Sequence, residues 1–292
     1  MTAALRLSTG HVSATVHLPS QLDTTAAAAA RRMLPGGWRL DPPGSGAAAP
    51  AVEVTLGPAA VTADDTTVRV RLPQAAACTE GLAYLTYTAL ERARQQDRKL
   101  TVHASALHAP GGQALLLLGE KSAGKTSTAL ALARHGWTHA GDDLVVIGED
   151  NAGLAAVWAG KPTAAVRDPR QPLAPKAVRE LTPFADGPAP LGRVVRLAVH
   201  PGLPLSLAPA VPLTVNEKLR LHEALARQIS GLPTPLAGLG TVPYGPVWPL
   251  DAPELARWRS SLLSRLAACR FDYLYAPDAE SAAARLAAEE AW

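Results

Sequence analysis

Hydrophobic residues follow strand-like and helix-like periods in turn, most clearly in the middle third of the chain. Residues 100–109 and 114–118 are apolar runs of strand length, and the Pro-Gly-Gly turn at 110–112 predicts that they pair as a hairpin. The Ala- and Leu-rich stretch from Lys125 predicts a helix that ends at Gly136, because glycine favours the left-handed C-cap. A short apolar run at 144–147 predicts another buried strand.

We expect the first 98 residues to form a small α+β domain, in which no catalytic or binding motif is recognisable. We expect residues 99–292 to form a larger α/β domain. In the first, we expect strands at 12–18 and 67–72, an alanine run at 26–30, a Pro- and Gly-rich loop at 41–50 and a helix at 79–96. In the second, weaker patterns predict strands at 155–166, 193–199 and 271–275, helices at 216–230, 252–268 and 279–290, and a long Pro- and Gly-rich loop at 233–249.

Composition and charge narrow the setting of the protein. The 292 residues carry a net charge of +3 without a long basic run, so no nucleic-acid partner is expected. Cys78 and Cys269 lie far apart without metal-ligand spacing, which predicts buried thiols in a reducing compartment. The pattern shows neither a signal peptide nor an apolar run of the roughly 18 residues that a membrane helix needs. We therefore expect a cytoplasmic protein without a membrane partner, and a homo-oligomer is compatible with this composition.

One motif carries most of the chemistry. Gly119 to Thr126 fits the phosphate-binding loop pattern G-x-x-x-x-G-K-[ST], with a predicted strand before it and a predicted helix after it. In such a loop, backbone N–H groups surround a nucleotide's phosphates, the lysine (Lys125) reaches the β and γ phosphates, and the hydroxyl (Thr126) coordinates Mg²⁺. The sequence therefore predicts ATP and Mg²⁺ as cofactors, bound by Gly119, Glu120, Lys121, Ser122, Ala123, Gly124, Lys125, Thr126 and Ser127.

Two adjacent carboxylates, Asp142 and Asp143, follow Lys125 by 17 and 18 residues at a predicted junction of loop and strand. Two carboxylates there can divide two tasks, since one can hold Mg²⁺ and the other can accept a proton from an attacking hydroxyl. The alternative is a solvated Asp-Asp turn. The chain contains neither an apolar run ending in Asp-Glu, as an ATPase would, nor an Asn-Lys-x-Asp guanine signature.

A histidine precedes the loop on the predicted hairpin. Pairing of the hairpin strands would place His103 near the γ-phosphate or near an aspartate that it could orient. The alternatives are a structural strand histidine and His108, which lies at the turn end of the hairpin and is expected to be exposed.

These elements together resemble the catalytic core of HPr kinase/phosphorylase. The resemblance spans about residues 100–147 and rests on His103, the loop, the Arg134-His135-Gly136 helix end and the Ala140-Gly141-Asp142-Asp143 strand entry. It implies a PEP-carboxykinase-like variant of the phosphate-loop kinase fold and transfer of phosphate from ATP to a serine hydroxyl. By matching position, it implies Asp142 as the base for the acceptor, Thr126 and Asp143 as metal ligands, and Asp143 alternatively as a partner of His103.

The chain departs from that family in two places. Lys121 and Ser122 stand where the family loop has Ser and its middle Gly, and the later Glu-x-Arg-Gly signature is not recognisable. These departures argue against a phosphorylase activity and against HPr itself as the substrate. The chain is more similar to divergent members of the family, some of which phosphorylate a serine of ribosomally made peptides, including lasso peptides.

Several further residues are candidates for weaker roles. The cations that could neutralise a transferred phosphate are Lys161 and Arg167, followed by Arg193, Arg196 and Lys218. The aromatic side chains that could line a peptide groove are Tyr244, Trp248 and Trp258. The leading hypothesis is a serine kinase acting on a peptide or protein. The alternatives are a small-molecule hydroxyl kinase and a nucleotide sensor without turnover.

Overall fold

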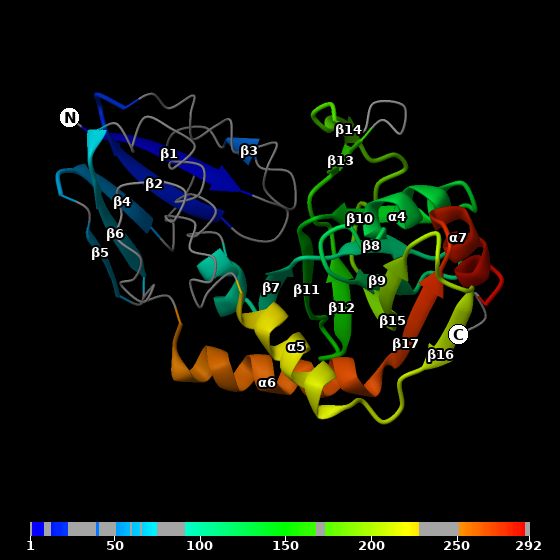
Figure 1. The fold of residues 1–292 in the computed structure, drawn as a ribbon. Coiled ribbons are helices and arrows are strands. Elements are labelled where there is room, and N and C mark those ends of the chain that lie inside the picture. The colour runs from blue at the N-terminus through cyan, green and yellow to red at the C-terminus, as the bar shows by residue number, and fades with distance from the viewer. Residues whose placement is uncertain are drawn as a thin grey trace. The chain divides into compact units, whose positions relative to one another are not determined.

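The structure is a computed structural model that describes residues 2–8, 13–22, 39–40, 51–58, 60–64, 66–74, 91–167, 173–227 and 251–289. The chain forms two compact units (Figure 1), one made of Met1–Leu100 and Leu225–Arg259, and the other of Thr101–Ala224 and Ser260–Trp292. The sequence-based division into functional domains at residues 98 and 99 stays a prediction.

The first unit is built on a six-stranded sheet in the order β3-β1-β2-β4-β6-β5. Its strands are β1 (Thr2–Ser8), β2 (Ser13–Pro19), β3 (Arg39–Leu40), β4 (Ala51–Leu56), β5 (Ala60–Ala63) and β6 (Thr67–Leu72). Buried positions alternate along β2 and β6, because one face of the sheet packs into a core and the other meets solvent. The predicted strand at 67–72 is confirmed, and the one at 12–18 is shifted by one residue.

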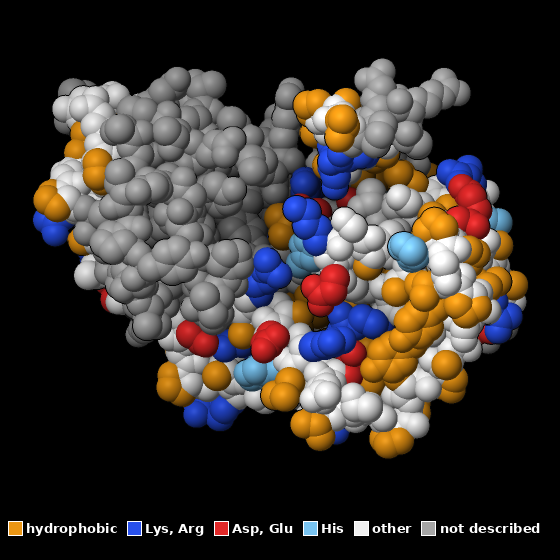
Figure 2. All heavy atoms as spheres, in the orientation of Figure 1, with side chains coloured by type: hydrophobic (Ala, Val, Ile, Leu, Met, Phe, Trp, Pro, Cys, Tyr) orange, Lys and Arg blue, Asp and Glu red, His pale blue; other side chains and the backbone are white. Residues whose placement is uncertain are grey.

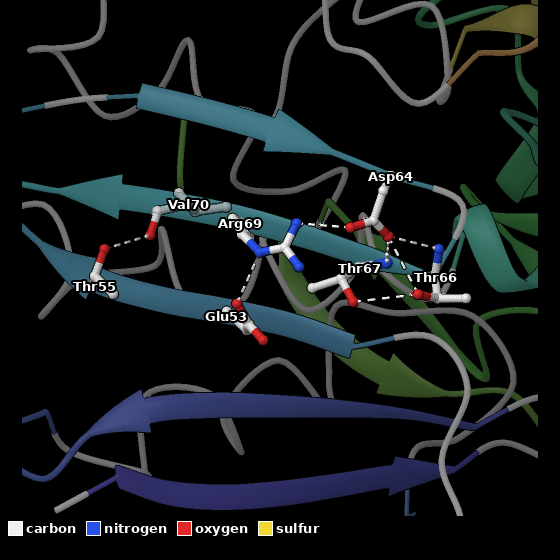
Figure 3. A network of polar contacts seen from close by, with 7 residues as sticks. All are labelled: Glu53, Thr55, Asp64, Thr66, Thr67, Arg69 and Val70. Carbon is white, nitrogen blue, oxygen red and sulfur yellow. Dashed lines mark hydrogen bonds and ion pairs between the residues drawn. The ribbon is translucent and has the colours of Figure 1, made fainter.

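The exposed face of this sheet carries a polar network (Figure 3). Arg69 on β6 bonds to Glu53 on β4 at 3.1 Å and to Asp64 at 2.7 Å, and Asp64 also accepts the backbone N–H groups of Thr66 and Thr67. This network ties a turn to two neighbouring strands. The predicted features at 26–30 and 41–50 lie outside the described residues, as does most of the helix predicted at 79–96, of which residues 91–96 are helical.

The second unit contains a nine-stranded sheet whose main path runs β10-β8-β9-β15-β12-β11-β7, with β17 beside β15 and β16 beside β17. Its strands are β7 (Lys99–Val102), which starts at the last two residues of the first unit, β8 (Ser105–His108), β9 (Ala114–Leu118), β10 (Thr138–Asp142), β11 (Val145–Glu149), β12 (Ala155–Trp158), β15 (Ala189–Val199), β16 (Ser206–Pro209) and β17 (Arg270–Ala276). A separate hairpin joins β13 (Thr163–Val166) to β14 (Ala177–Glu180).

The helices follow the predicted positions closely. They are α4 (Lys125–Ala133), α5 (Val215–Ala226), α6 (Pro253–Ala268), which runs through both units, and α7 (Ala279–Ala287). Helices α4 and α7 share a core with one face of the sheet, in which Leu107, Leu117, Val195 and the fully buried Trp137 take part. Burial of these apolar side chains fixes the position of α4 against the sheet, and hence the position of the loop before it.

The predicted hairpin is confirmed, since β8 and β9 pair antiparallel from Ser105 opposite Leu117 to His108 opposite Ala114. The predicted strand at 100–109 is divided by a bend at His103 and Ala104, and the one at 155–166 is divided into β12 and β13. The structure is thus a mixed α/β protein, as predicted. The described residues include no helix that is long and apolar enough to cross a membrane.

Candidate functional site

The phosphate-loop sequence forms a tight connection between β9 and α4. Gly124, the residue before the helix, has a φ of +89°, and a Cβ there would lie 2.7 Å from Val199. A Cβ on Gly119 would lie 2.8 Å from the carbonyl oxygen of Leu197. Both contacts come from the end of β15, whose Val199 N–H donates to Ala123 at 3.1 Å. Glycine is required at these two positions because the loop passes so close to β15.

Lys125, the first residue of α4, turns its side chain back over the loop. Its Nζ donates to the carbonyl oxygens of Gly119 at 2.8 Å and of Glu120 at 3.1 Å. Burial lowers the pKa of this ammonium group, and the negative charges of Asp142, Asp143 and Glu120 oppose the shift. The helix N-terminus and this lysine create a positive end that suits an anion.

Asp142 is the buried member of the carboxylate pair, with 3% of its surface exposed. It ends β10, directly opposite Ser105 on β8. Its carboxylate accepts the hydroxyl of Ser105 and, at 3.0 Å to each oxygen, the hydroxyl of Thr126. Burial raises the pKa of Asp142, and the hydrogen bonds from Ser105 and Thr126 oppose that rise.

Asp143 is the exposed member of the pair, with half of its side chain accessible. Its backbone turns through a φ of +66°, so its carboxylate leaves the direction of β10. It lies 3.1 Å from Nδ1 of His103 and 3.5 Å from Nζ of Lys161. The hydrogen bond from His103, aided by the charge of Lys161, lowers the pKa of Asp143 to about 2, against a smaller opposing effect of burial.

Backbone contacts hold the two carboxylates in place. Gly160 packs against the turn after β10, where its N–H donates to Ala140 at 2.6 Å and a Cβ would lie 2.5 Å from the carbonyl oxygen of Leu144. The next residue, Lys161, exchanges backbone hydrogen bonds with Asp142 and Leu144 at 3.2 and 2.8 Å. The glycine allows two chain segments to touch, and this contact brings the lysine to the carboxylates.

The structure thus brings His103 to Asp143, and the hydroxyl of Thr126 to Asp142 rather than to Asp143. Ser105 contacts the same carboxylate and was missed in the sequence. The sequence carries no reliable signal for this contact, because a bend at His103 and Ala104 separates His103 from β8, and the contact depends on the pairing of β8 with β10. Glu120, Lys121 and Ser122 are exposed on the loop, and Ser127 is exposed in the first turn of α4, as an open phosphate site requires. His108 is half-buried rather than exposed, and burial lowers its pKa.

The weaker candidates fall into different settings. Lys161 reaches Asp143, whereas Arg193 is buried in ion pairs with Asp272 and Glu289 and cannot meet a ligand. Trp258 is a core residue, and Tyr244 and Trp248 lie outside the described residues. Figure 2 shows acidic and basic side chains side by side on the visible face of the second unit, beneath the β13–β14 hairpin.

A cation would find neighbouring oxygen ligands at Thr126 and Asp142, whose side-chain oxygens lie 3.0 Å apart. In the part of the chain that the structure describes, there is no group of three or more His, Cys, Asp and Glu side chains suited to a metal. Magnesium in nucleotide sites needs only one or two protein ligands, because phosphates and waters supply the rest. The hydroxyl and the carboxylate therefore fit the group that the sequence predicts.

Comparisons with known proteins add little. No family model matches the sequence. No curated protein matches it either. Among solved structures, the Hpr(Ser) kinase/phosphatase from Coxiella burnetii is 14% identical over 36% of this chain and 76% of that chain, with a TM-score of 0.28. A likeness of this size carries no argument, so the assignment rests on the geometry of the site.

Proposed function

We propose that the protein is a kinase that transfers the γ-phosphate of Mg-ATP to a hydroxyl group. The observation that carries this proposal is that the two carboxylates have different surroundings. Asp142 is buried and accepts the Thr126 hydroxyl, whereas Asp143 is half-exposed and bonded to His103. A phosphate loop beside one carboxylate for metal and one for the acceptor has the parts that phosphoryl transfer requires.

In this mechanism, the loop backbone and Lys125 hold the β and γ phosphates. The Thr126 hydroxyl and Asp142 would hold Mg²⁺, which would supply positive charge to offset the negative charge of the phosphates. We assign to Asp143 the role of general base for the acceptor hydroxyl. A general base must reach that hydroxyl, and the carboxylate of Asp142 is covered by Ser105 and Thr126. This assignment exchanges the two roles that the resemblance implied.

The chemical step is an in-line displacement. The acceptor oxygen forms a bond to the γ-phosphorus, the bond from that phosphorus to the bridging oxygen breaks, and ADP leaves with the electron pair. The acceptor proton passes to Asp143, which His103 and Lys161 keep ionised. A carboxylate of low pKa suits this task because the transition state of phosphoryl transfer is loose, so that orienting the hydroxyl matters more than removing its proton early.

We further propose a serine of a peptide or protein as the acceptor, in line with the resemblance seen in the sequence, and a ribosomally made precursor peptide of the lasso type as its narrowest form. A small-molecule hydroxyl is the second candidate. Both would be phosphorylated by the same residues, so only the acceptor distinguishes them.

The test is transfer of label from γ-labelled ATP in the presence of Mg²⁺, with serine-containing peptides in one series and a metabolite pool in the other. Asp143→Asn should abolish transfer at every Mg²⁺ concentration, whereas Asp142→Asn should raise the Mg²⁺ concentration needed. Asp186→Asn is the matched control, since Asp186 is an exposed aspartate in the same unit. Unchanged transfer by Asp143→Asn would refute the mechanism. ATP binding by the wild type without transfer to any acceptor would favour the sensor.

A further inference from the structure

Strand β15 carries two arginines, Arg193 and Arg196, that the structure sorts into different roles. They are three residues apart, and side chains alternate along a strand, so they lie on opposite faces of the sheet. Arg193 is fully buried on Asp272. Arg196 lies in register with Leu118, the last residue of β9 before the phosphate loop, and keeps 18% of its side chain exposed.

A second buried carboxylate holds Arg196. Oε1 of Glu217 accepts Nε of Arg196 at 3.1 Å and also its Nη2, and Oε2 accepts the hydroxyl of Tyr273 at 3.3 Å. Glu217 is 2% exposed and lies in the first turn of α5, where its N–H donates to the Thr214 hydroxyl at 3.2 Å. Tyr273 lies opposite Arg196 on β17. The arginine is therefore held by Glu217 at the start of a helix, and Tyr273 on β17 holds that glutamate in turn.

The same arginine lies on the strand that supports the phosphate loop. Its neighbours on β15 support the loop directly, through the close approach of Leu197 to Gly119 and the hydrogen bond from Val199 to Ala123. Its charge also acts on Lys125, whose pKa it helps to lower, so the two cations share one electrostatic environment.

A guanidinium group can serve two anions at once. It carries five N–H donors in a planar fork, and Glu217 takes the Nε and Nη2 edge. Within the described part of the chain, Nη1 has no partner in the structure, which leaves this side of the fork for an oxygen outside the protein.

We propose that Arg196 contacts the terminal phosphates of the bound nucleotide, and that Glu217 and Tyr273 are positioning residues that aim it. This inference rests on the proposed function and adds to it a second fixed positive charge, on the β15 side of the loop. Asp142 and Asp143, by contrast, lie on the β10 side. Phosphate is thereby held between Lys125 and Arg196.

The test is calorimetric titration of the full-length protein with Mg-ATP and, in parallel, with AMP. Arg196→Ala should raise the Kd for Mg-ATP about ten- to a hundredfold, as expected for loss of a charge-assisted hydrogen bond, and leave the Kd for AMP within about twofold. Arg196→Lys should recover only part of the loss, because lysine cannot bridge Glu217 and a phosphate. Glu217→Gln should weaken Mg-ATP but not AMP, a selectivity that a merely structural residue would not show.

Arg179→Ala is the matched control, because Arg179 is an exposed arginine on β14 of the same unit. Equal Mg-ATP affinity in the wild type, Arg196→Ala and Glu217→Gln would overturn this inference and leave the kinase proposal standing. Failure of the wild type to bind Mg-ATP at all would overturn both. Arg196→Lys and Glu217→Gln retain the size of the native side chains, so the comparison does not depend on the folding of the alanine variant.

Discussion

Arg69 and Arg193 each bridge two carboxylates, and their surroundings differ completely. In the first unit, Arg69 joins Glu53 and Asp64 on the open face of a sheet (Figure 3), and all three side chains are about half-exposed. In the second unit, Arg193 joins Asp272 and Glu289 with none of its own side chain exposed and only 1% of Asp272. The same kind of arginine–carboxylate ion pair is thus exposed to water in one unit and buried in the interior of the other.

The difference in burial indicates which charged groups are suited to a functional site. An exposed ion pair contributes little, because water and salt screen it and solvate either partner alone. A buried charge is strongly coupled to its partner, so its position and protonation depend on the fold. The second unit contains several such groups, including Lys125, Asp142 and Glu217. The charged groups of the network in Figure 3, Glu53, Asp64 and Arg69, are all about half-exposed, and we assign them a surface role.

The largest expected effect is that of Arg193→Ala. Removing the guanidinium group leaves Asp272 buried with Arg270 as its one remaining cationic partner among the described residues, so the free energy of unfolding should fall by about 3–5 kcal/mol. Urea denaturation followed by circular dichroism measures this loss. A change no larger than that of Arg69→Ala would show that burial does not distinguish the two networks.

Gly124→Ala should come next. The new Cβ would meet Val199 at 2.7 Å, and alanine would have to adopt a φ of +89°, at a cost of about 1–3 kcal/mol. Gly111→Ala is the control, because a Cβ at that turn meets nothing within 4 Å. Both variants are compared by thermal unfolding. Equal stability of the two would contradict the close packing of the loop on β15.

Asp142→Asn should alter the pH dependence of stability. Burial raises the pKa of Asp142 above its unfolded value of 3.8, so its stabilising contribution is complete below that value and is lost as pH rises through the folded pKa. With both proteins free of ligand, the unfolding free energy of the wild type minus that of Asp142→Asn should therefore decline from pH 4 towards neutral pH. A difference that increases over this range would refute the burial argument.

Arg69→Ala should have the smallest effect. Its partners remain solvated when the guanidinium group is removed, so the urea midpoint should not change measurably. The same denaturation experiment as for Arg193→Ala provides the comparison. A clear loss of stability would show that the exposed network is a structural element of the first unit.

Local features of the second unit could be predicted from the sequence. The strand at 114–118, the loop and the start of α4 at Lys125 follow from a continuous apolar run, two glycines and a strong helix-forming stretch. Each of these signals acts within a few residues. Proximity of His103 and the Asp142-Asp143 pair also followed, since a hairpin and a short helix leave little freedom.

The assignment of contacts at the site could not be predicted from local signals. Thr126 meets Asp142 because β10 pairs with β8 in a register that places Asp142 opposite Ser105, and because the chain bends sharply at Asp143. Register and bend depend on packing between segments far apart in the sequence. Glu217 lies 21 residues from Arg196, and no periodic pattern connects them. The different faces of Arg193 and Arg196, by contrast, could have been inferred from their odd spacing in a predicted strand, but charge alone groups the two together.

The central claim is that Gly119 to Thr126 binds the phosphates of a nucleotide, and titration of the wild type, Lys125→Ala and Lys176→Ala with Mg-ATP tests it most directly. Lys125 lies over the loop and bonds to it, whereas Lys176 is an exposed lysine of the same unit outside the loop. We predict that the wild type binds, that Lys125→Ala loses binding, and that Lys176→Ala retains it. Equal affinity of Lys125→Ala and the wild type would contradict the account.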